Sequence, residues 1–290
     1  MDITIVATII LNGLVLGGVY LLVAVGLNII FNLSRILNLA HGAFYTLGAY
    51  FSYTMLALGW NYFAALIVSP LLVALLALVI ERPIIAPIRG RHLVYTLIIT
   101  FGLMFVLEGL VHYFWGAQTR YIDLPEYMTQ QLSIAGFYYS SYKIIVLILS
   151  LLIFVCLLIF LAKTRYGKIL RAASRIPEMV SILGVNMRFI HIGTFVLGAF
   201  LAGAAGVIAG PLYTVYPDMG HQMLVISFVV LVIGGVGSLR GTVPAAFLVG
   251  FVQSLCEFFI TELAMVIVFL TMAVVLAFMP RGLLREGRFE

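Results

Sequence analysis

The chain has 290 residues, of which 64% are hydrophobic and only 9% are charged, and its formal net charge is +5. Soluble domains carry about 25% charged residues, so a chain this apolar cannot cover a water-facing surface. The positive charge is spread over loops between apolar segments along the chain, which argues against nucleic acid as a partner.

Apolar segments follow one another along the whole chain, and most are close to the ~20 residues that a helix needs to cross a bilayer. Membrane β-barrels do not fit, because their strands alternate apolar and polar residues. We predict an all-α, polytopic transmembrane helix bundle with about eight or nine spans, forming a single membrane domain over 1–290. The segments are 4–30, 38–58, 62–80, 93–115, 142–162, 190–209, 222–237, 243–261 and 264–279.

Polar and small residues within three of the segments are candidates for a substrate pathway. Asn38 and His41 open an apolar span, either as a helix cap at the inner face or as substrate contacts. Thr96 and Thr100 share one helix face and either line a seam or bond back to their own helix. The glycines favour either close helix packing or a broken helix, which membranes tolerate only against protein or a cavity. The predicted pathway residues are Asn38, His41, Gly42, Thr96, Thr100, Gly102, Gly234 and Gly235.

One charged stretch interrupts the apolar pattern at Arg171–Arg188. We predict a short helix there, with a break or fresh helix start at Pro177, because proline suits a first helical turn. Glu178 then lies near a helix N-terminus, and Gly184 can close the helix in a left-handed conformation. The stretch is either a partner-binding segment or an ordinary loop on the membrane surface.

Basic residues indicate the orientation, since Lys and Arg favour cytoplasmic loops. All but two of the 16 fall on one set of alternate loops, and the exceptions are Arg120 and Lys143. We therefore predict a cytoplasmic C-terminus, a cytoplasmic segment over 164–189 and an external loop over 116–141. The basic loops hold Arg35, Arg82, Arg89, Arg91, Lys163, Arg165, Lys168, Arg171, Arg175, Arg188, Arg240, Arg281, Arg285 and Arg288.

Catalytic and metal motifs are missing from the sequence. It contains no phosphate-binding loop, no H-E-x-x-H and no G-x-S-x-G, so we predict a chain without catalytic residues, metal or bound cofactor. The two cysteines lie within apolar segments and do not suggest a disulfide. Glu108 and Glu257 lie near the outer ends of spans, either as ion sites or paired with polar neighbours.

Four stretches of the sequence carry a resemblance to a known family, in the family's own order. They are "LNLAHGAFYTLGAY", "ERPIIAPIRGRHLVYTLIITFG", "TRYGKILRAASRIPEMVSILGVN" and "VVLVIGGVGSLRGTVPAAFLVGF". The chain resembles the branched-chain amino acid permeases of ABC importers over essentially its whole length. Glu178 to Gly184 is similar to the E-A-A-x-x-x-G coupling loop of ABC permeases, although Met179 and Val180 replace the alanines and the later Leu-Pro is absent.

The resemblance implies a permease domain with a coupling segment over 164–189 in a bacterial cytoplasmic membrane. It implies a second homologous permease subunit, two ATP-binding subunits that hold ATP and Mg²⁺, and an external binding protein that selects the substrate. Separately, "AHGAFYTLGAY" and "TVPAAFLVGF" share Ala-Phe followed by a glycine, which suggests two related halves, as inverted repeats would produce. The coupling residues implied are Arg171, Arg175, Glu178, Met179, Leu183, Gly184 and Asn186.

Other functions stay open at this point. The same resemblance extends to importers of urea, short amides and aromatic acids. An ion-coupled carrier acting alone would use Glu108 or Glu257. An intramembrane hydrolase would need a buried nucleophile or metal set, which the sequence lacks.

Overall fold

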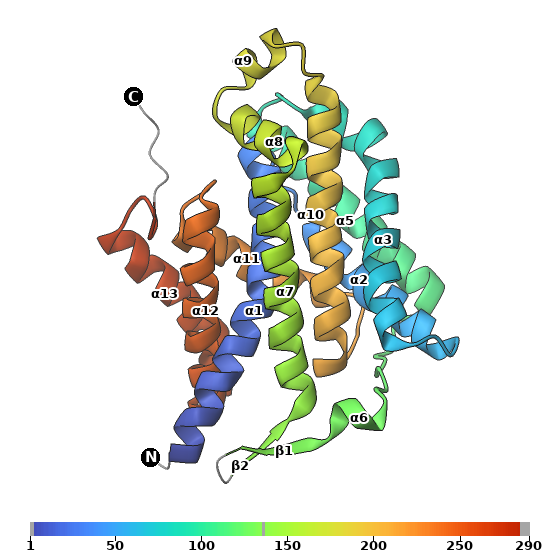
Figure 1. The fold of residues 1–290 in the computed structure, drawn as a ribbon, viewed down its shortest axis with the longest axis vertical. Coiled ribbons are helices and arrows are strands. Elements are labelled where there is room, and N and C mark those ends of the chain that lie inside the picture. Colours follow the sequence, from blue (N-terminus) through green and yellow to red (C-terminus); the bar gives the residue numbers. More distant parts are fainter. Residues whose placement is uncertain (1–2, 135–136, 285–290) are drawn as a thin grey trace.

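The computed structural model describes residues 3–134 and 137–284, which form a helical bundle with one small β-hairpin at one end (Figure 1). Among these residues, seven helical segments are long and apolar enough to cross a membrane. Two shorter helices, α2 (His41–Ala57) and α11 (Met219–Gly234), complete the set. Each apolar segment of the sequence contains one of these helices, which confirms the predicted bundle.

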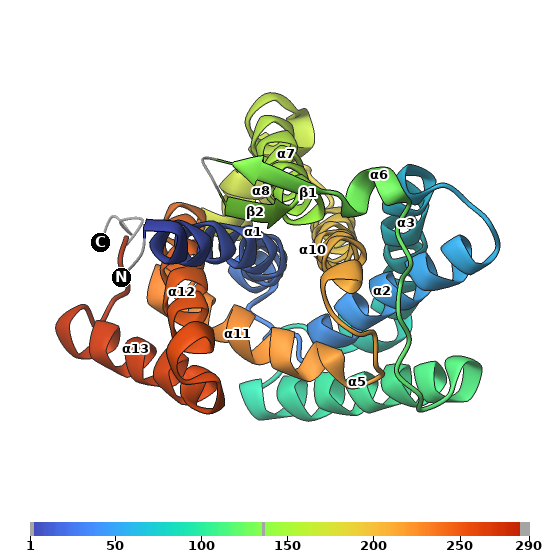
Figure 2. The same cartoon turned by 90° about the horizontal axis from the view of Figure 1, so that it is seen from below.

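Helix α1 (Ile3–Ser34) runs through the centre of the bundle, between α7, α10, α11 and α12 (Figure 2). A helix that is apolar all round belongs in the interior, and 89% of the most apolar part of α1 is buried. The long helices around it are α7 (Ser141–Lys163), α10 (Met187–Ala209) and α12 (Leu239–Phe259).

The outer helices expose large apolar side chains on the outside of the bundle. This surface suits a bilayer, because lipid tails are as apolar as the side chains that face them. After α3 the chain passes through one π-helical stretch and a short turn of helix before α5. The elements are α3 (Tyr62–Ile80), the π-helix Glu81–Ile85, α4 (Ala86–Ile88), α5 (Leu93–Trp115), the 3₁₀ turn Thr261–Leu263 and α13 (Ala264–Phe278).

The two ends of the bundle differ in charge. The hairpin end carries α6 (Glu126–Thr129) and the antiparallel strands β1 (Gln131–Ile134) and β2 (Phe137–Ser140), all within the loop predicted over 116–141. The opposite end, here called the basic end, carries α8 (Arg165–Arg175), α9 (Pro177–Ile182) and every described basic residue except Arg120 and Lys143. The predicted C-terminal arginines Arg285 and Arg288 lie outside the described residues.

A re-entrant segment, residues 35–40, follows α1 and turns back into the bundle. Arg35 adopts a left-handed conformation with φ of 54°, which reverses the chain at the end of α1. Thr100 of α5 donates a hydrogen bond to the Leu37 carbonyl (3.2 Å), and the His41 ring nitrogen Nε2 lies 3.0 Å from the Val23 carbonyl. Val23 lies about three turns before the end of α1, so α2 begins inside the bundle.

This placement corrects one interpretation of the sequence. The residue before α2 is Ala40, and no side chain caps the helix. Asn38 is therefore not a side-chain cap, and His41 does not lie at the inner face. Of the two alternatives given for these residues, the helix cap at the inner face is wrong, and substrate contact stays a prediction.

A second break enters from the hairpin end. After α10 and a 3₁₀ turn (Gly210–Leu212), residues 213–218 lead back to α11, which also begins inside the bundle. Gly42 of α2 packs directly against Gly220 of α11, and a methyl group on either would overlap the backbone of the other. The two broken units run in opposite directions and meet at what is here called the glycine crossing, the arrangement expected of inverted halves.

Candidate functional site

The charged segment at the basic end folds as two short helices, as the sequence predicts. The Thr164 hydroxyl accepts a hydrogen bond from the Gly167 amide (3.0 Å) and caps α8. Ile176 is not helical, and Pro177 begins α9. Gly184, with φ of +81°, closes α9 in the left-handed region, where it has no steric penalty.

Helix α10 begins directly after this segment and is joined to α8. The Asn186 side chain accepts a hydrogen bond from the Arg188 amide (3.0 Å), which caps α10. The Tyr166 hydroxyl of α8 donates to the Ile190 carbonyl of α10 (2.9 Å). Burial raises the pKa of Tyr166, so this phenol stays protonated and keeps donating. The hydrogen bond therefore ties α8 to the start of α10.

Exposed apolar side chains mark the outermost part of the basic end. Met179, Ile182 and Leu183 are 59%, 80% and 81% exposed, and Glu178 is exposed beside them. These four residues are here called the α9 tip, which stands beyond the bundle (Figure 1). Large apolar side chains on a short closed helix have the character of a protein-binding anchor.

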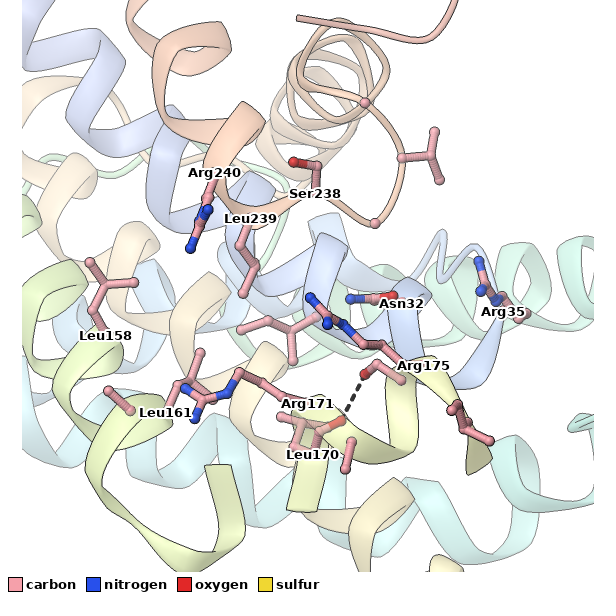
Figure 3. A pocket seen from close by; sticks show the side chains of 18 of the residues that line it. Asn32, Arg35, Leu158, Leu161, Leu170, Arg171, Arg175, Ser238, Leu239 and Arg240 are labelled. Carbon is pink, nitrogen blue, oxygen red and sulfur yellow. Dashed lines mark hydrogen bonds between the residues drawn. The ribbon is translucent and has the colours of Figure 1, made fainter. Parts of the chain in front are cut away.

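The arginines of α8 lie elsewhere than the α9 tip. Arg171 and Arg175 line a cavity of about 1050 Å³ between α8, the end of α1 and the start of α12. Figure 3 shows their side chains extending into this space, with Arg240 reaching in from α12. Arg35 and Arg281 also line this space, which is here called the arginine cavity. The structure therefore separates the predicted coupling residues Arg171 and Arg175 from those of the α9 tip.

The turn between α11 and α12 forms one wall of the arginine cavity. Gly235 and Gly237 have φ of +94° and +88°, so the helix pattern is broken there as the sequence suggests. Asn28 of α1 holds the turn: its amide donates to the Ser238 carbonyl (3.1 Å) and accepts from the Gly237 amide (3.0 Å). Its amide also donates to the Thr242 hydroxyl (2.7 Å). The break is thus fixed to the central helix.

Unpartnered polar atoms gather near the glycine crossing. Neither side-chain amide atom of Asn38 has a hydrogen-bond partner, nor does Nδ1 of His41, and both residues are fully buried. Buried polar groups normally find partners, so unsatisfied ones inside a membrane bundle indicate a functional position. Thr100 contacts the same segment, whereas Thr96 bonds within its own helix, to Leu93.

The predicted pathway residues do not all lie together. Asn38, His41, Gly42 and Thr100 surround the start of α2. Gly235 lines the arginine cavity, and Gly234 packs against Gly241. Gly102 lies on the open outer face of α5, where an added methyl group would meet no atom within 4 Å. Their role in transport stays a prediction.

A second cavity, of about 170 Å³, lies between α1, α2, α11, α12 and the 213–218 break. The Tyr45 hydroxyl and the Gln253 carbonyl oxygen are buried here without partners. Gln253 donates to the Glu257 carboxylate (2.9 Å), which gives the cavity an acidic group. The aromatic lining of this tyrosine cavity comes from Tyr20, Tyr45, Tyr213 and Tyr216.

The acidic residues singled out in the sequence have polar neighbours. Glu108 of α5 lies 2.5 Å from the His221 ring of α11, and Glu257 accepts the hydrogen bond from Gln253. Over residues 3–134 and 137–284, no group of three His, Cys, Asp or Glu residues is placed to hold a metal ion.

The family described as "branched-chain amino acid transport system / permease component" matches residues 9–276. The chain belongs to this family. The match spans every membrane helix in the bundle apart from the first turns of α1 and the last residues of α13.

Relatives of this permease cover nearly its whole length. LivH of Escherichia coli (strain K12), a high-affinity branched-chain amino acid transport system permease protein, is 30% identical over 295 residues, 96% of this chain and 95% of LivH. BraD of Pseudomonas aeruginosa, named in the same terms, is 29% identical with the same coverage. A probable branched-chain amino acid transport permease of Methanocaldococcus jannaschii is 22% identical over 87% of this chain and 81% of its own.

A solved structure shares the fold of this permease. PsaBC from Streptococcus pneumoniae in complex with Fab superposes with a TM-score of 0.50 and 14% sequence identity. The superposition covers 92% of this chain and 89% of that one. At this identity the likeness concerns the fold alone.

Sequence reasoning missed several residues that line the cavities of the permease. Arg35, Arg240 and Arg281 come from three separate loops, and only folding brings them beside α8. Tyr20 and Tyr45 look like ordinary apolar-segment residues in the sequence. The one sequence signal that could have pointed to the arginine cavity was Arg35, an isolated charged residue directly after an apolar segment.

Proposed function

We propose that this permease is the membrane subunit of an ATP-driven ABC importer that moves branched-chain or other hydrophobic amino acids into the cytoplasm by alternating access. The α9 tip carries this proposal, because its exposed apolar residues have the chemistry of an anchor for another subunit. The chain has no phosphate loop of its own, so ATP and Mg²⁺ belong to two separate ATP-binding subunits.

The proposed assembly includes a second homologous permease subunit and an external substrate-binding protein. The basic end faces the cytoplasm of a bacterium, because 12 of the 14 described Lys and Arg residues lie there, and the C-terminus is cytoplasmic. The hairpin end, with its ordered α6 and β-hairpin, then faces the binding protein.

Substrate passes close to the glycine crossing in this proposal. The unpartnered amide of Asn38 and the tyrosine cavity supply polar contacts, and the surrounding side chains accommodate an apolar side chain. Movement of the α9 tip reaches this region through α8, the Tyr166 hydrogen bond and α10, whose far end leads into the 213–218 break. Such a rigid connection suits alternating access.

A first experiment tests the anchor. Leu183→Asp places a charge on the tip, and Leu58→Asp places the same charge at a similarly exposed position (72%) on the hairpin end. We expect ATP-binding subunits to co-purify with the wild type and Leu58→Asp but not with Leu183→Asp. If both variants retain these subunits equally, the tip is not their docking site.

A second experiment tests the orientation. In a background without Cys156 and Cys256, Ser181→Cys on α9 and Tyr138→Cys on β2 place single thiols at opposite ends. A membrane-impermeant maleimide should label Tyr138→Cys in intact cells and Ser181→Cys only in inverted vesicles. The reverse pattern would overturn the orientation.

A third experiment tests the substrate class. The complete assembly is placed in proteoliposomes with its cytoplasmic face toward the lumen, which contains ATP. These proteoliposomes should take up leucine, isoleucine and valine. Urea, acetamide and benzoate serve as competitors, since importers of urea, short amides and aromatic acids resemble this family. Uptake of one of these instead, or uptake driven by an ion gradient without ATP, would replace the proposal.

A further inference from the structure

The arginine cavity concentrates positive charge from separate parts of the chain. Arg35 follows α1, Arg171 and Arg175 belong to α8, Arg240 lies at the start of α12, and Arg281 follows α13. Like charges in one cavity repel one another, and the repulsion is stronger beside a low-dielectric bilayer than in water. The arrangement is stable when an anion shares the cavity.

For four of these arginines, no described carboxylate supplies that anion. The three ion pairs found over residues 3–134 and 137–284 involve Arg89, His112 and His221, and none involves Arg35, Arg171, Arg175 or Arg281. The guanidinium group presents donors in a planar fork that matches phosphate oxygens. A phosphate group therefore has the right charge and geometry for the cavity.

The opposite wall of the cavity is apolar and continues onto the membrane surface. Leu158 and Leu161 line it from the last turns of α7, and Ile29 lines it from α1. Leu158 is 42% exposed, and the apolar face of α7 is largely uncovered, with only 28% of the most apolar part of the helix buried. An acyl chain along α7 thus leads directly to the arginines.

The depth of the cavity matches a lipid headgroup. Helix α7 ends at Lys163, where basic side chains replace apolar ones, so Leu158 lies just inside the hydrocarbon boundary. Arg171 and Arg175 lie just beyond it. Basic pockets between membrane helices at this level bind acidic headgroups, and the cytoplasmic leaflet is the anionic one.

We propose that the arginine cavity binds an anionic phospholipid, with its phosphate among the arginines and an acyl chain along α7. The lipid bridges α8 to α1 and α12. It thereby fixes α8, the helix that leads directly into α9. This assignment is independent of the transported substrate. It also gives Arg171 and Arg175 a role distinct from the tip residues that follow them.

Lipid binding to the purified permease tests the assignment directly. Delipidated protein in a neutral detergent is titrated with phosphatidylglycerol, phosphatidylcholine or glycerol phosphate, and bound lipid is counted by native mass spectrometry. We expect phosphatidylglycerol to bind at least tenfold more tightly than phosphatidylcholine, and glycerol phosphate, which lacks acyl chains, not to compete at the same concentration.

Paired variants locate the site. Arg171→Gln with Arg175→Gln should weaken phosphatidylglycerol binding about 30-fold, because each arginine contributes about fivefold near an anionic lipid. Arg165→Gln with Lys168→Gln removes the same charge from α8 at positions that do not line the cavity and should change binding less than about threefold. Arg35→Gln should weaken phosphatidylglycerol binding about fivefold. It replaces the first pair as the test if that pair lowers the yield of folded protein.

Several results would overturn the proposal. Equal binding of the two phospholipids, or equal losses in the two variant pairs, would mean that general surface charge attracts lipid. Competition by glycerol phosphate would indicate a site for free anions. Normal lipid binding by the Arg171→Gln and Arg175→Gln pair, with loss of ATP-binding subunits, would assign these arginines to a protein interface.

Discussion

The glycine crossing and the α9 tip both depend on glycine, for opposite physical reasons. Gly42 has an ordinary helical conformation but no room for a methyl group, because the backbone of Gly220 occupies the space. A methyl group on Gly184 would meet no atom within 4 Å, but the φ of +81° strains any larger residue there. Buried helix contacts thus select glycine for its size, whereas an exposed helix end selects it for its backbone freedom.

The largest effect is expected from Gly42→Ala. The added methyl group overlaps backbone atoms, which cannot turn aside as a side chain can, so α2 and α11 must move apart. We expect a loss of ~3 kcal/mol or more in the free energy of unfolding, the upper range for overpacking. Thermal unfolding in detergent and the yield of monodisperse protein measure it.

Gly102→Ala is the matched control for that substitution. It adds the same methyl group to another membrane helix, at a position with no atom within 4 Å. Because alanine is the better helix former, the unfolding temperature should stay constant or rise slightly. Equal losses in both variants would show that the glycine crossing is not close-packed.

Asn28→Leu should cause a smaller but still large loss in the free energy of unfolding. It tests the buried contact between α1 and the turn that joins α11 to α12, which depends on hydrogen bonds instead of residue size. The substitution leaves the Gly237 amide and the Thr242 hydroxyl without their Asn28 partner in the interior. The expected cost is ~2–3 kcal/mol, seen as a lower unfolding temperature. Asn32→Leu, one turn along α1 where no described residue bonds the amide, should cost much less. Similar falls in unfolding temperature for both variants would mean that the hydrogen bonds of Asn28 do not stabilise the fold.

Gly184→Ala sharpens the comparison at the exposed region. A left-handed alanine costs about 1 kcal/mol, and the tip buries little, so α9 should open locally while the unfolding temperature hardly changes. Hydrogen exchange of residues 177–184 should accelerate. Gly184→Asn should exchange more slowly than the alanine variant, since asparagine tolerates this conformation. Identical exchange in the wild type and the alanine variant would contradict the strain argument.

The smallest effect is expected from Thr100→Val. Among the described residues, this substitution removes the only side-chain hydrogen bond from α5 to the Leu37 carbonyl of the re-entrant segment. Hydrogen bonds between membrane helices contribute about 0.6 kcal/mol, so a small fall in unfolding temperature is expected. Thr96→Val loses only a bond within its own helix and is the control. A larger loss in Thr96→Val would mean that the re-entrant segment is held by other contacts.

Local rules explain what could be predicted from the sequence. The helix start at Pro177 and the closure at Gly184 depend on neighbouring residues alone, so both could be predicted. The apolar segments likewise determine their own helices. The family resemblance was visible because its motifs are continuous stretches of sequence.

Long-range contacts explain what could not be predicted. The depth at which α2 begins depends on the contact of His41 with the Val23 carbonyl and of Gly42 with Gly220, and neither partner is near in the chain. Gly102 was grouped with Thr100 by proximity in sequence, yet it lies on the opposite, outer face of α5. The arginine cavity combines arginines from four separate stretches of the chain, and no local pattern connects them.

The hydrogen bonds of Asn28 can form only late in the synthesis of the chain. Asn28 enters the bilayer early, and its partner Ser238 lies 210 residues later in the chain. At ~5–20 residues per second a ribosome needs roughly 10–40 s to supply it. During that interval the amide of Asn28 lies in the last two turns of the first membrane helix, with its final partners not yet made. The insertion machinery, or a chaperone for membrane helices, must therefore shelter the end of α1 until the start of α12 arrives.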